Sequence, residues 1–222
     1  MRHTAVISTR DLSLLPDVDG LRALLQALAT LDAIVCPEWG YRYYSFNCAW
    51  SAVEQMGSMR NGSGDDFFAH FSAAGCWLKG FAHESPMSPY AHQPKRVWPG
   101  LLDSVPAEFA ACLREPAFSA ENVTFCIWRR TTDRRWEKGS ISYPSDVPDP
   151  DGSEDLLSIL DGRPEKYRKF AGHYYDKDLS LTSIEHVYRG RPLTPEIVAS
   201  LNPERSIDEL AGDLTEIGYP FG

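Results

Sequence analysis

Leucine residues recur at helical spacing near the beginning of the chain. They occupy positions 21, 24, 25, 28 and 31, so one face of a helix would be continuously apolar. Asp17 and Asp19 precede this run, where carboxylates favour the positive end of a helix, and Pro37 lies just beyond it. The pattern predicts an amphipathic helix over residues 18–35.

Extended segments and turn signals alternate through the middle of the chain. Aromatic-rich and alternating stretches favour strands, and clusters of Asn, Gly, Ser and Asp favour turns. The predicted elements are a strand over 41–47, a helix over 49–59 that stops at the turn 61–64, a hairpin of 66–71 and 76–81 around 73–75, a helical stretch over 100–114 that restarts at Pro106, and a second hairpin of 122–130 and 134–143 around 131–133.

The pattern becomes helical from about residue 153 onward. Asp151 and Glu154, and likewise Ser206 and Glu209, have the spacing of a capping box, and Thr194-Pro195 places proline at a helix start. Strands without long helical crossovers, with helices at both ends, are typical of an α+β fold. We therefore predict a mainly antiparallel sheet built from hairpins, flanked by an N-terminal helix and a helical C-terminal third.

We expect one domain over residues 1–222, with a helical C-terminal subdomain over about 153–222. The Pro- and Asp-rich stretch 144–151 is the candidate internal boundary. The composition, with 43% hydrophobic and 24% charged residues among 222, is that of a folded globular protein.

The net charge of −9 argues against a protein that binds duplex nucleic acid or an anionic membrane. Residues 1–10 lack the apolar run of a secretory signal, and no window approaches a membrane-spanning helix. Five scattered cysteines, none in a Cys-x-x-Cys pair, favour reduced thiols and a cytoplasmic protein.

Several candidate sites fail on spacing. The acidic segment 149–155 lacks the glycine and glutamate positions of a calcium loop, so it is interpreted as opening the next helix. His83, Glu84 and His92 lie among prolines and lack zinc-site spacing. Ser63 and Ser85 lack the context of a catalytic nucleophile. We therefore predict no metal, no cofactor and no catalytic residue.

Two polar segments are predicted to leave one end of the first hairpin side by side. They would gather a cation, acids and a base into a candidate binding or polar cluster, which is the first place to look for function. A structural interpretation, in which Arg60 pairs with Asp65 or Glu84 to fix a loop, is the alternative. The cluster comprises Arg60, Asp65, Asp66, His83 and Glu84.

Residues 128–138 form the one basic patch, with five cations and two tryptophans. Trp128, Arg130, Arg134 and Trp136 are the candidate partner surface. Interleaved aromatic and basic residues can bind single-stranded nucleic acid. The same pattern suits a charged hairpin tip that discourages aggregation, or a surface that meets an acidic segment of the chain itself or of a partner protein.

Four segments resemble a family of bacterial hypothetical proteins without an assigned function. They are 59–65, 79–89, 150–157 and 200–204, and the similarity would extend over residues 39–220. The resemblance implies a bacterial source and a single full-length unit. It carries no catalytic residue over to this chain.

These observations favour a non-enzymatic cytosolic binding protein with a protein partner, of which an immunity-type protein that neutralises a toxin is one form. The acidic charge would speed association with a basic partner. The alternative is a small hydrolase or transferase that uses the loops 60–66 and 83–92. The sequence leaves the partner and the oligomeric state open.

Overall fold

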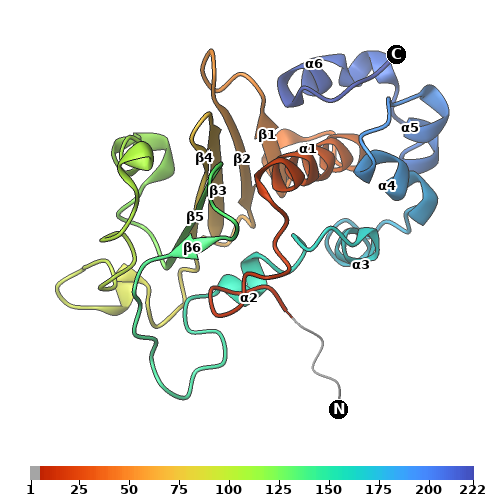
Figure 1. The fold of residues 1–222 in the computed structure, drawn as a ribbon. Helices are drawn as coiled ribbons and strands as arrows, with labels where there is room; N and C mark the ends of the chain where they lie inside the picture. Colours follow the sequence, from red (N-terminus) through yellow and green to blue (C-terminus); the bar gives the residue numbers. More distant parts are fainter. Residues whose placement is uncertain (1–5) are drawn as a thin grey trace. The chain divides into compact units, whose positions relative to one another are not determined.

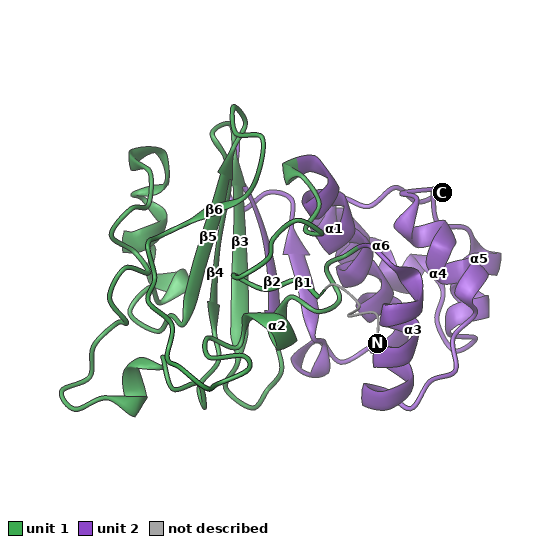
Figure 2. Cartoon of the chain, turned by 60° about the horizontal axis from the view of Figure 1, so that its bottom comes forward, with its two compact units in different colours: residues 1–18, 60–161 green, residues 19–59, 162–222 purple. Residues whose placement is uncertain are grey.

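The computed structural model describes residues 6–222 and divides the chain into two compact units (Figure 2). Unit 1 comprises residues up to Val18 together with Arg60–Asp161, and unit 2 comprises Asp19–Met59 together with Gly162–Gly222. Each unit is therefore assembled from two separate stretches of chain. The boundary in the second half of the chain falls at 161/162 and lies outside the Pro- and Asp-rich stretch 144–151.

Unit 1 contains an antiparallel array of four strands in the order β3–β4–β5–β6 (Figure 1). The strands are β3 (Asp66–Ser72), β4 (Gly75–Phe81), β5 (Phe125–Arg130) and β6 (Glu137–Lys138). Both predicted hairpins are confirmed, although the partner strand of the second one is limited to two residues. Ser72 pairs with Gly75 at the first turn, and Ile127 pairs with Lys138 in the second hairpin.

All seven residues of β4 are buried, which fits its nearly continuous apolar sequence. Phe109 and Phe118 contribute to this core from short 3₁₀ helices in the segment that joins β4 to β5. The ring of Phe118 lies 5.6 Å from that of Trp77 in β4. These short helices are Pro89–Ala91, Ala107–Phe109, Cys112–Arg114 and Pro116–Phe118.

The predicted helix over 100–114 is wrong, because this region forms only turns and the 3₁₀ helices described above. Pro106 precedes a three-residue helix as its cap and does not begin a longer one. Hydrogen bonds from Ala110 to Ala107 and from Arg114 to Ala111 close tight turns that are not extended.

The short helix α2 (Ser153–Leu156) completes unit 1. Asp151 and Glu154 do not form the predicted capping box, since Gly152 is the residue at the cap. Asp149 instead accepts hydrogen bonds from the backbone N–H groups of Glu154 and Asp155, both at 3.1 Å. The interpretation of this acidic segment as the opening of a helix is confirmed, with a different carboxylate in the capping role.

Unit 2 combines one hairpin with five α-helices among its described residues. The hairpin consists of β1 (Tyr44–Asn47) and β2 (Gln55–Arg60), whose last residue belongs to unit 1. The helices are α1 (Val18–Val35), α3 (Pro164–Tyr174), α4 (Leu181–Tyr188), α5 (Pro195–Leu201) and α6 (Ile207–Ile217).

The predicted helix over 18–35 is confirmed, as are the helix starts at Thr194-Pro195 and Ser206. Thr194 caps α5, and Ser206 with Glu209 forms a complete capping box. Together with the antiparallel hairpins, these helices confirm the α+β class. No helix within residues 6–222 is both long and apolar enough to cross a bilayer.

The predicted helix over 49–59 is wrong, because residues 55–60 form β2 and the residues before them form turns. Gly57 shows the reason. A Cβ at this position would lie 2.8 Å from Cδ1 of Leu25 on α1, so the bare backbone lets the hairpin approach the helix closely. Pairing with β1 and packing on α1 therefore outweigh a weak local preference.

Candidate functional site

The first half of the candidate polar cluster is a turn that leads into β3. Asn61 organises it, because its side-chain oxygen accepts hydrogen bonds from the backbone N–H groups of Ser63 (2.8 Å) and Asp65 (3.1 Å). The side-chain amide of Asn61 donates to the carboxylate of Asp65 at 2.7 Å. Gly62 and Gly64 have φ of 72° and 112°, a backbone geometry that favours glycine. The turn thus holds the Asp65 carboxylate in one orientation.

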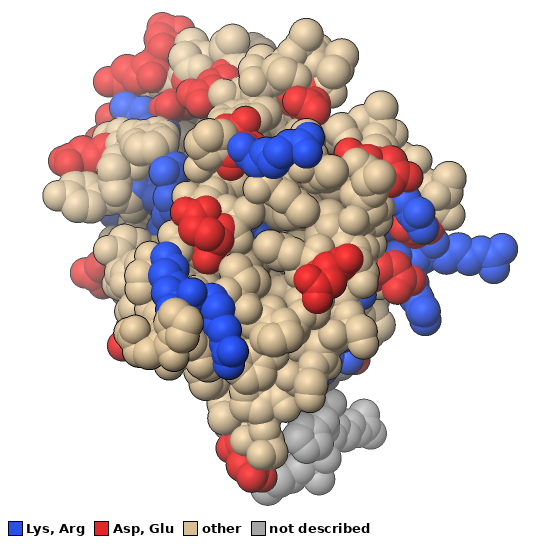
Figure 3. Space-filling model, turned by 90° about the vertical axis from the view of Figure 1, so that its left-hand side faces the viewer, with Lys and Arg blue, Asp and Glu red and all other residues tan. Residues whose placement is uncertain are grey.

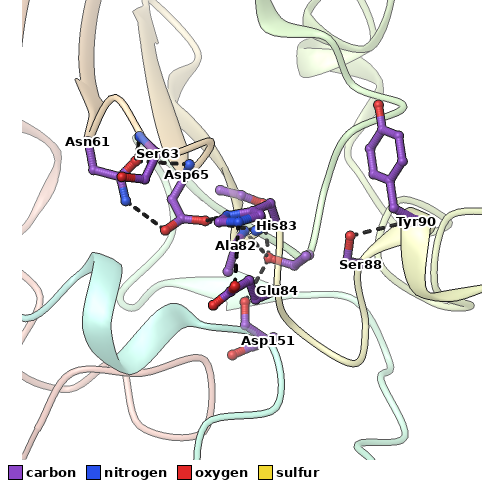
Figure 4. A network of polar contacts seen from close by, with 11 residues as sticks. Asn61, Ser63, Asp65, Ala82, His83, Glu84, Ser88, Tyr90 and Asp151 are labelled. Carbon is purple, nitrogen blue, oxygen red and sulfur yellow. Dashed lines mark hydrogen bonds and ion pairs between the residues drawn. The ribbon is translucent and has the colours of Figure 1, made fainter.

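The second half of the polar cluster follows β4. The Asp65 carboxylate accepts two hydrogen bonds from His83, from the backbone N–H at 2.8 Å and from imidazole Nδ1 at 2.7 Å (Figure 4). The hydrogen bond to Asp65 raises the pKa of His83 above its usual value. The same contacts hold the pKa of Asp65 below its usual value, against the opposing effect of burial. A carboxylate-oriented imidazole of this kind leaves Nε2 available for proton exchange.

The remaining members of the predicted cluster lie differently. Glu84 is exposed and its carboxylate is 3.9 Å from Nε2 of His83. Arg60 lies exposed at the end of β2. Asp66 is turned to a different partner, the ammonium group of Lys79 at 2.7 Å. The structure therefore brings together Asp65, His83 and Glu84, and assigns Asp66 to a separate ion pair.

Ser85, the candidate nucleophile nearest to His83 in sequence, is occupied structurally. Its hydroxyl donates to the carbonyl of Pro150 at 2.7 Å and accepts from the backbone N–H of Met87 at 3.0 Å. The side chain is buried. The contacts of Asp65 and of Ser85 described above join loops of unit 1 to one another. The partner of Asp65 is His83, whereas the structural interpretation named Arg60 in that role.

We expect the substitution Asp65→Asn to lower the pKa of His83 toward the ordinary value for histidine. Removal of the negative charge weakens the hydrogen bond that stabilises the imidazolium form. Histidine side-chain resonances followed by NMR across a pH titration measure this change. Glu84→Gln is the matched control and should shift the same pKa less, because its carboxylate lies farther away. Equal shifts in the two variants would contradict the assignment.

The structure buries two of the four residues of the predicted partner surface in the basic hairpin 128–138. Trp128 and Trp136 are 4% and 5% exposed, so both rings belong to the interior of unit 1. The Trp136 ring donates a hydrogen bond to the carbonyl of Pro16 at 2.6 Å. Arg130 forms an ion pair with Asp133 that closes the hairpin, with a shortest distance of 3.0 Å. Arg134 is exposed and borders a hollow of unit 1.

A surface feature of unit 2 was missed by sequence reasoning. Trp39 and Tyr41 belong to a three-residue 3₁₀ helix (Trp39–Tyr41) and are 56% and 65% exposed. The sequence interpretation placed Tyr41 in a strand. The signal that could have identified the turn is Pro37 followed by Glu38, Trp39 and Gly40, in which proline and glycine bracket the aromatic residue. We call residues 38–41 the aromatic turn.

Arg42 fixes the aromatic turn to its surroundings. Its guanidinium donates to the carbonyls of Cys36 (2.8 Å) and Pro37 (3.1 Å), and it forms a bidentate pair with the Asp213 carboxylate at 2.8 and 2.9 Å. Asp213 lies on α6. Because the Arg42 side chain is only 7% exposed, this pair is shielded from solvent. The exposed rings are thus carried on a rigid base.

Two glutamates lie at the aromatic turn. Glu38 belongs to the turn itself, and Glu216 shares a shallow recess of about 20 Å³ with Trp39. Residues 195–217, which form α5 and α6, contain six carboxylates and one arginine. On the face shown in Figure 3, acidic and basic side chains are interspersed among uncharged ones. The six carboxylates counted above lie on α5, on α6 and in the segment that joins them.

No known family model matches the chain, and no curated protein or solved structure is significantly similar to it. The resemblance to a bacterial family stays a prediction. Residues 6–222 contain no group of three or more His, Cys, Asp or Glu side chains placed to hold a metal ion. All five cysteines are free, and four of them are buried, whereas Cys48 is half-buried.

Proposed function

We propose that the protein is a non-enzymatic binding protein that engages a basic protein partner through the aromatic turn. The observation that carries this proposal is the exposure of two large aromatic side chains on a turn that Arg42 holds in place. Large aromatic residues dominate the energy of protein interfaces, and a preorganised surface loses little conformational entropy on binding.

The charge around the aromatic turn favours a basic partner. Glu38 adjoins Trp39 in the chain and Glu216 shares a recess with Trp39, so that a lysine or arginine of the partner could contact both the Trp39 ring and a carboxylate. An immunity-type protein that neutralises a basic toxin is the form of this function that we favour. The polar cluster would then serve to fix loops of unit 1.

The double substitution Trp39→Ala with Tyr41→Ala tests the proposal. We expect it to weaken the complex with the partner by at least about tenfold, because it removes two interface anchors. Gly40→Ala is the matched control, since a Cβ there would meet no atom within 4 Å. The wild type and both variants are used to capture partners from the source organism, and the affinity of each captured partner is then measured by calorimetry.

Support requires a stoichiometric basic protein that wild type and Gly40→Ala retain and the double variant loses. A toxic effect of that protein, relieved by co-expression of wild type but not of the double variant, would support the immunity form. Capture of the same proteins by all three forms would overturn the proposal. So would a captured partner that is acidic.

A further inference from the structure

A hollow of about 500 Å³ lies between the N-terminal segment of unit 1 and its second hairpin. Its volume is in the range of sites for small molecules. Residues 9–13 and 15 line one side and residues 129 and 134–138 line the other. We call this the cationic hollow because five of its lining side chains are basic: Arg10, Arg129, Arg134, Arg135 and Lys138.

The positive charge of the cationic hollow is incompletely compensated. Its two carboxylates are Asp11, which accepts a hydrogen bond from the backbone N–H of Ser13 at 3.0 Å, and Glu137, which pairs with Arg135 at 2.9 Å. Within residues 6–222, Arg10, Arg134 and Lys138 form no salt bridge with a carboxylate. Three cations therefore face the hollow, or its rim, without an anionic partner.

Two of these cations are held in position by neutral groups. Arg10 donates to the carbonyls of Pro148 (2.6 Å) and Val147 (3.3 Å). Arg10 and Lys138 also lie over the ring of Tyr143, at 5.2 and 5.4 Å from its centre. Carbonyl and ring contacts orient a cation without neutralising its charge. Arg134 makes no such contact among the described residues and is free to close on a ligand.

The walls of the cationic hollow are tied together by buried contacts. Thr9 bonds to the buried carboxylate of Asp151 and receives a hydrogen bond from Tyr143 at 2.8 Å. Ser153 accepts a hydrogen bond from the backbone N–H of Thr9 at 2.9 Å. These contacts anchor the N-terminal wall, and the bond from Trp136 to the carbonyl of Pro16 joins it to the hairpin. The hollow is therefore preformed, which reduces the entropic cost of binding.

We propose that the cationic hollow binds a compact anion with two or more oxyanion groups, as in a diphosphate or a polycarboxylate. Guanidinium groups match the paired oxygens of both chemistries. The size of the hollow limits the ligand to a small molecule. A long nucleic-acid strand fits poorly, because unit 1 carries 17 acidic and 12 basic residues, so the surface beyond the five cations of the hollow is mainly acidic.

This proposal is independent of the aromatic turn, since every residue of the cationic hollow belongs to unit 1. Titration calorimetry at low ionic strength with inorganic pyrophosphate and with citrate tests it. We expect saturable binding of at least one anion at a single site, weakened by added sodium chloride. The two probes distinguish a phosphate ligand from a carboxylate ligand, and either result supports the site.

Arg134→Ala should weaken that binding about tenfold, since a charge-assisted hydrogen bond to the ligand is lost. Arg134 is exposed and forms no hydrogen bond or ion pair with residues 6–222, so this variant should fold normally. Arg114→Ala, which alters another exposed arginine of unit 1 outside the hollow, is the matched control. It should leave the affinity unchanged.

Three results would overturn the proposal. The first is no binding of either anion at millimolar concentration. The second is an equal effect of the Arg134→Ala and Arg114→Ala substitutions, which would indicate diffuse electrostatic attraction. The third is tighter binding of a single-stranded oligonucleotide than of both small anions, which would assign the basic hairpin to nucleic acid instead.

Discussion

The substitution Asp32→Ala is expected to lower the free energy of unfolding by about 3–5 kcal/mol, because it leaves several buried donors without an acceptor. Asp32 lies on α1 and is fully buried. Its carboxylate accepts hydrogen bonds from the backbone N–H groups of Tyr43 (2.8 Å) and Tyr44 (2.7 Å). It also accepts from the hydroxyls of Tyr167 (2.8 Å) and Tyr175 (2.9 Å).

These four donors come from three parts of unit 2. Tyr43 and Tyr44 lie at the start of the hairpin, Tyr167 lies on α3, and Tyr175 directly follows it. Asp32 therefore joins α1 to both the hairpin and α3. Burial raises the pKa of Asp32 to about 6, despite the opposing effect of the hydrogen bonds. The four hydrogen bonds favour the ionised form, in which the carboxylate is a charged acceptor for all four groups.

Urea denaturation at pH 7, followed by circular dichroism, measures the change. Asp19→Ala is the matched control, since Asp19 is at the exposed start of α1 and pairs with Arg22 on the same helix at 2.9 Å. Surface pairs of this kind contribute less than about 1 kcal/mol. A loss for Asp32→Ala no larger than that for Asp19→Ala would show that water or rearranged hydroxyls satisfy the donors.

The bounds of α1 could be predicted from the sequence, whereas the hydrogen-bond partners of Asp32 on that helix could not. The leucine spacing of α1 is a local property, and it predicted the bounds of the helix correctly. The role of Asp32 depends on Tyr167 and Tyr175, which are 135 and 143 positions away in the chain. In the sequence, Asp32 is one of two charged residues in the stretch 21–35, and no periodicity encodes partners at that separation.

The two hairpins of unit 1 were predictable for a similar reason. Each is closed by a short turn between segments that pair with their immediate neighbours in sequence. The same locality placed Asp65 close to His83, since the Asp66–Phe81 pair in the register brings these two positions together. The specific bonds of Asp65 depend on the geometry of the Asn61 turn, which residue types alone do not determine.

Burial of aromatic residues was the least predictable property of the candidate sites. Trp128 and Trp136 lie among arginines in the sequence, yet their rings are buried while neighbouring side chains reach solvent. By contrast, the rings of Trp39 and Tyr41 are exposed. Alternation along a strand allows charged and buried residues to be adjacent, so local polarity does not indicate which ring is exposed.

Substitution of Lys79 is the second change that we expect to lower stability strongly. It lies in the middle of β4, and its side chain is fully buried. The ammonium group donates to the carboxylate of Asp66 at 2.7 Å and to the carbonyl of Asn122 at 3.0 Å, and it lies 5.1 Å from the ring centre of Phe68. Burial lowers the pKa of Lys79 and raises that of Asp66, so each ion depends on the other.

The substitution Lys79→Met should lower the free energy of unfolding by about 3 kcal/mol, because it keeps most of the side-chain volume but leaves the Asp66 carboxylate and the Asn122 carbonyl without their donor. Urea denaturation again measures the loss. Lys95→Met is the matched control, since Lys95 donates to the side-chain oxygen of Asn122 from an exposed position at 3.0 Å. We expect that control to lose less than about 1 kcal/mol.

A double variant separates the loss of packing from the loss of charge pairing. If the cost of Lys79→Met arises from an unpaired carboxylate, adding Asp66→Leu should restore part of the lost stability, since apolar replacement of a whole buried pair is often close to neutral. If the second substitution lowers stability further, the unpaired carboxylate is not the main source of the cost, and the lost contacts of the ammonium group with the Asn122 carbonyl and the Phe68 ring carry the effect. Wild-type stability in Lys79→Met alone would show that β4 tolerates the loss of the ion pair.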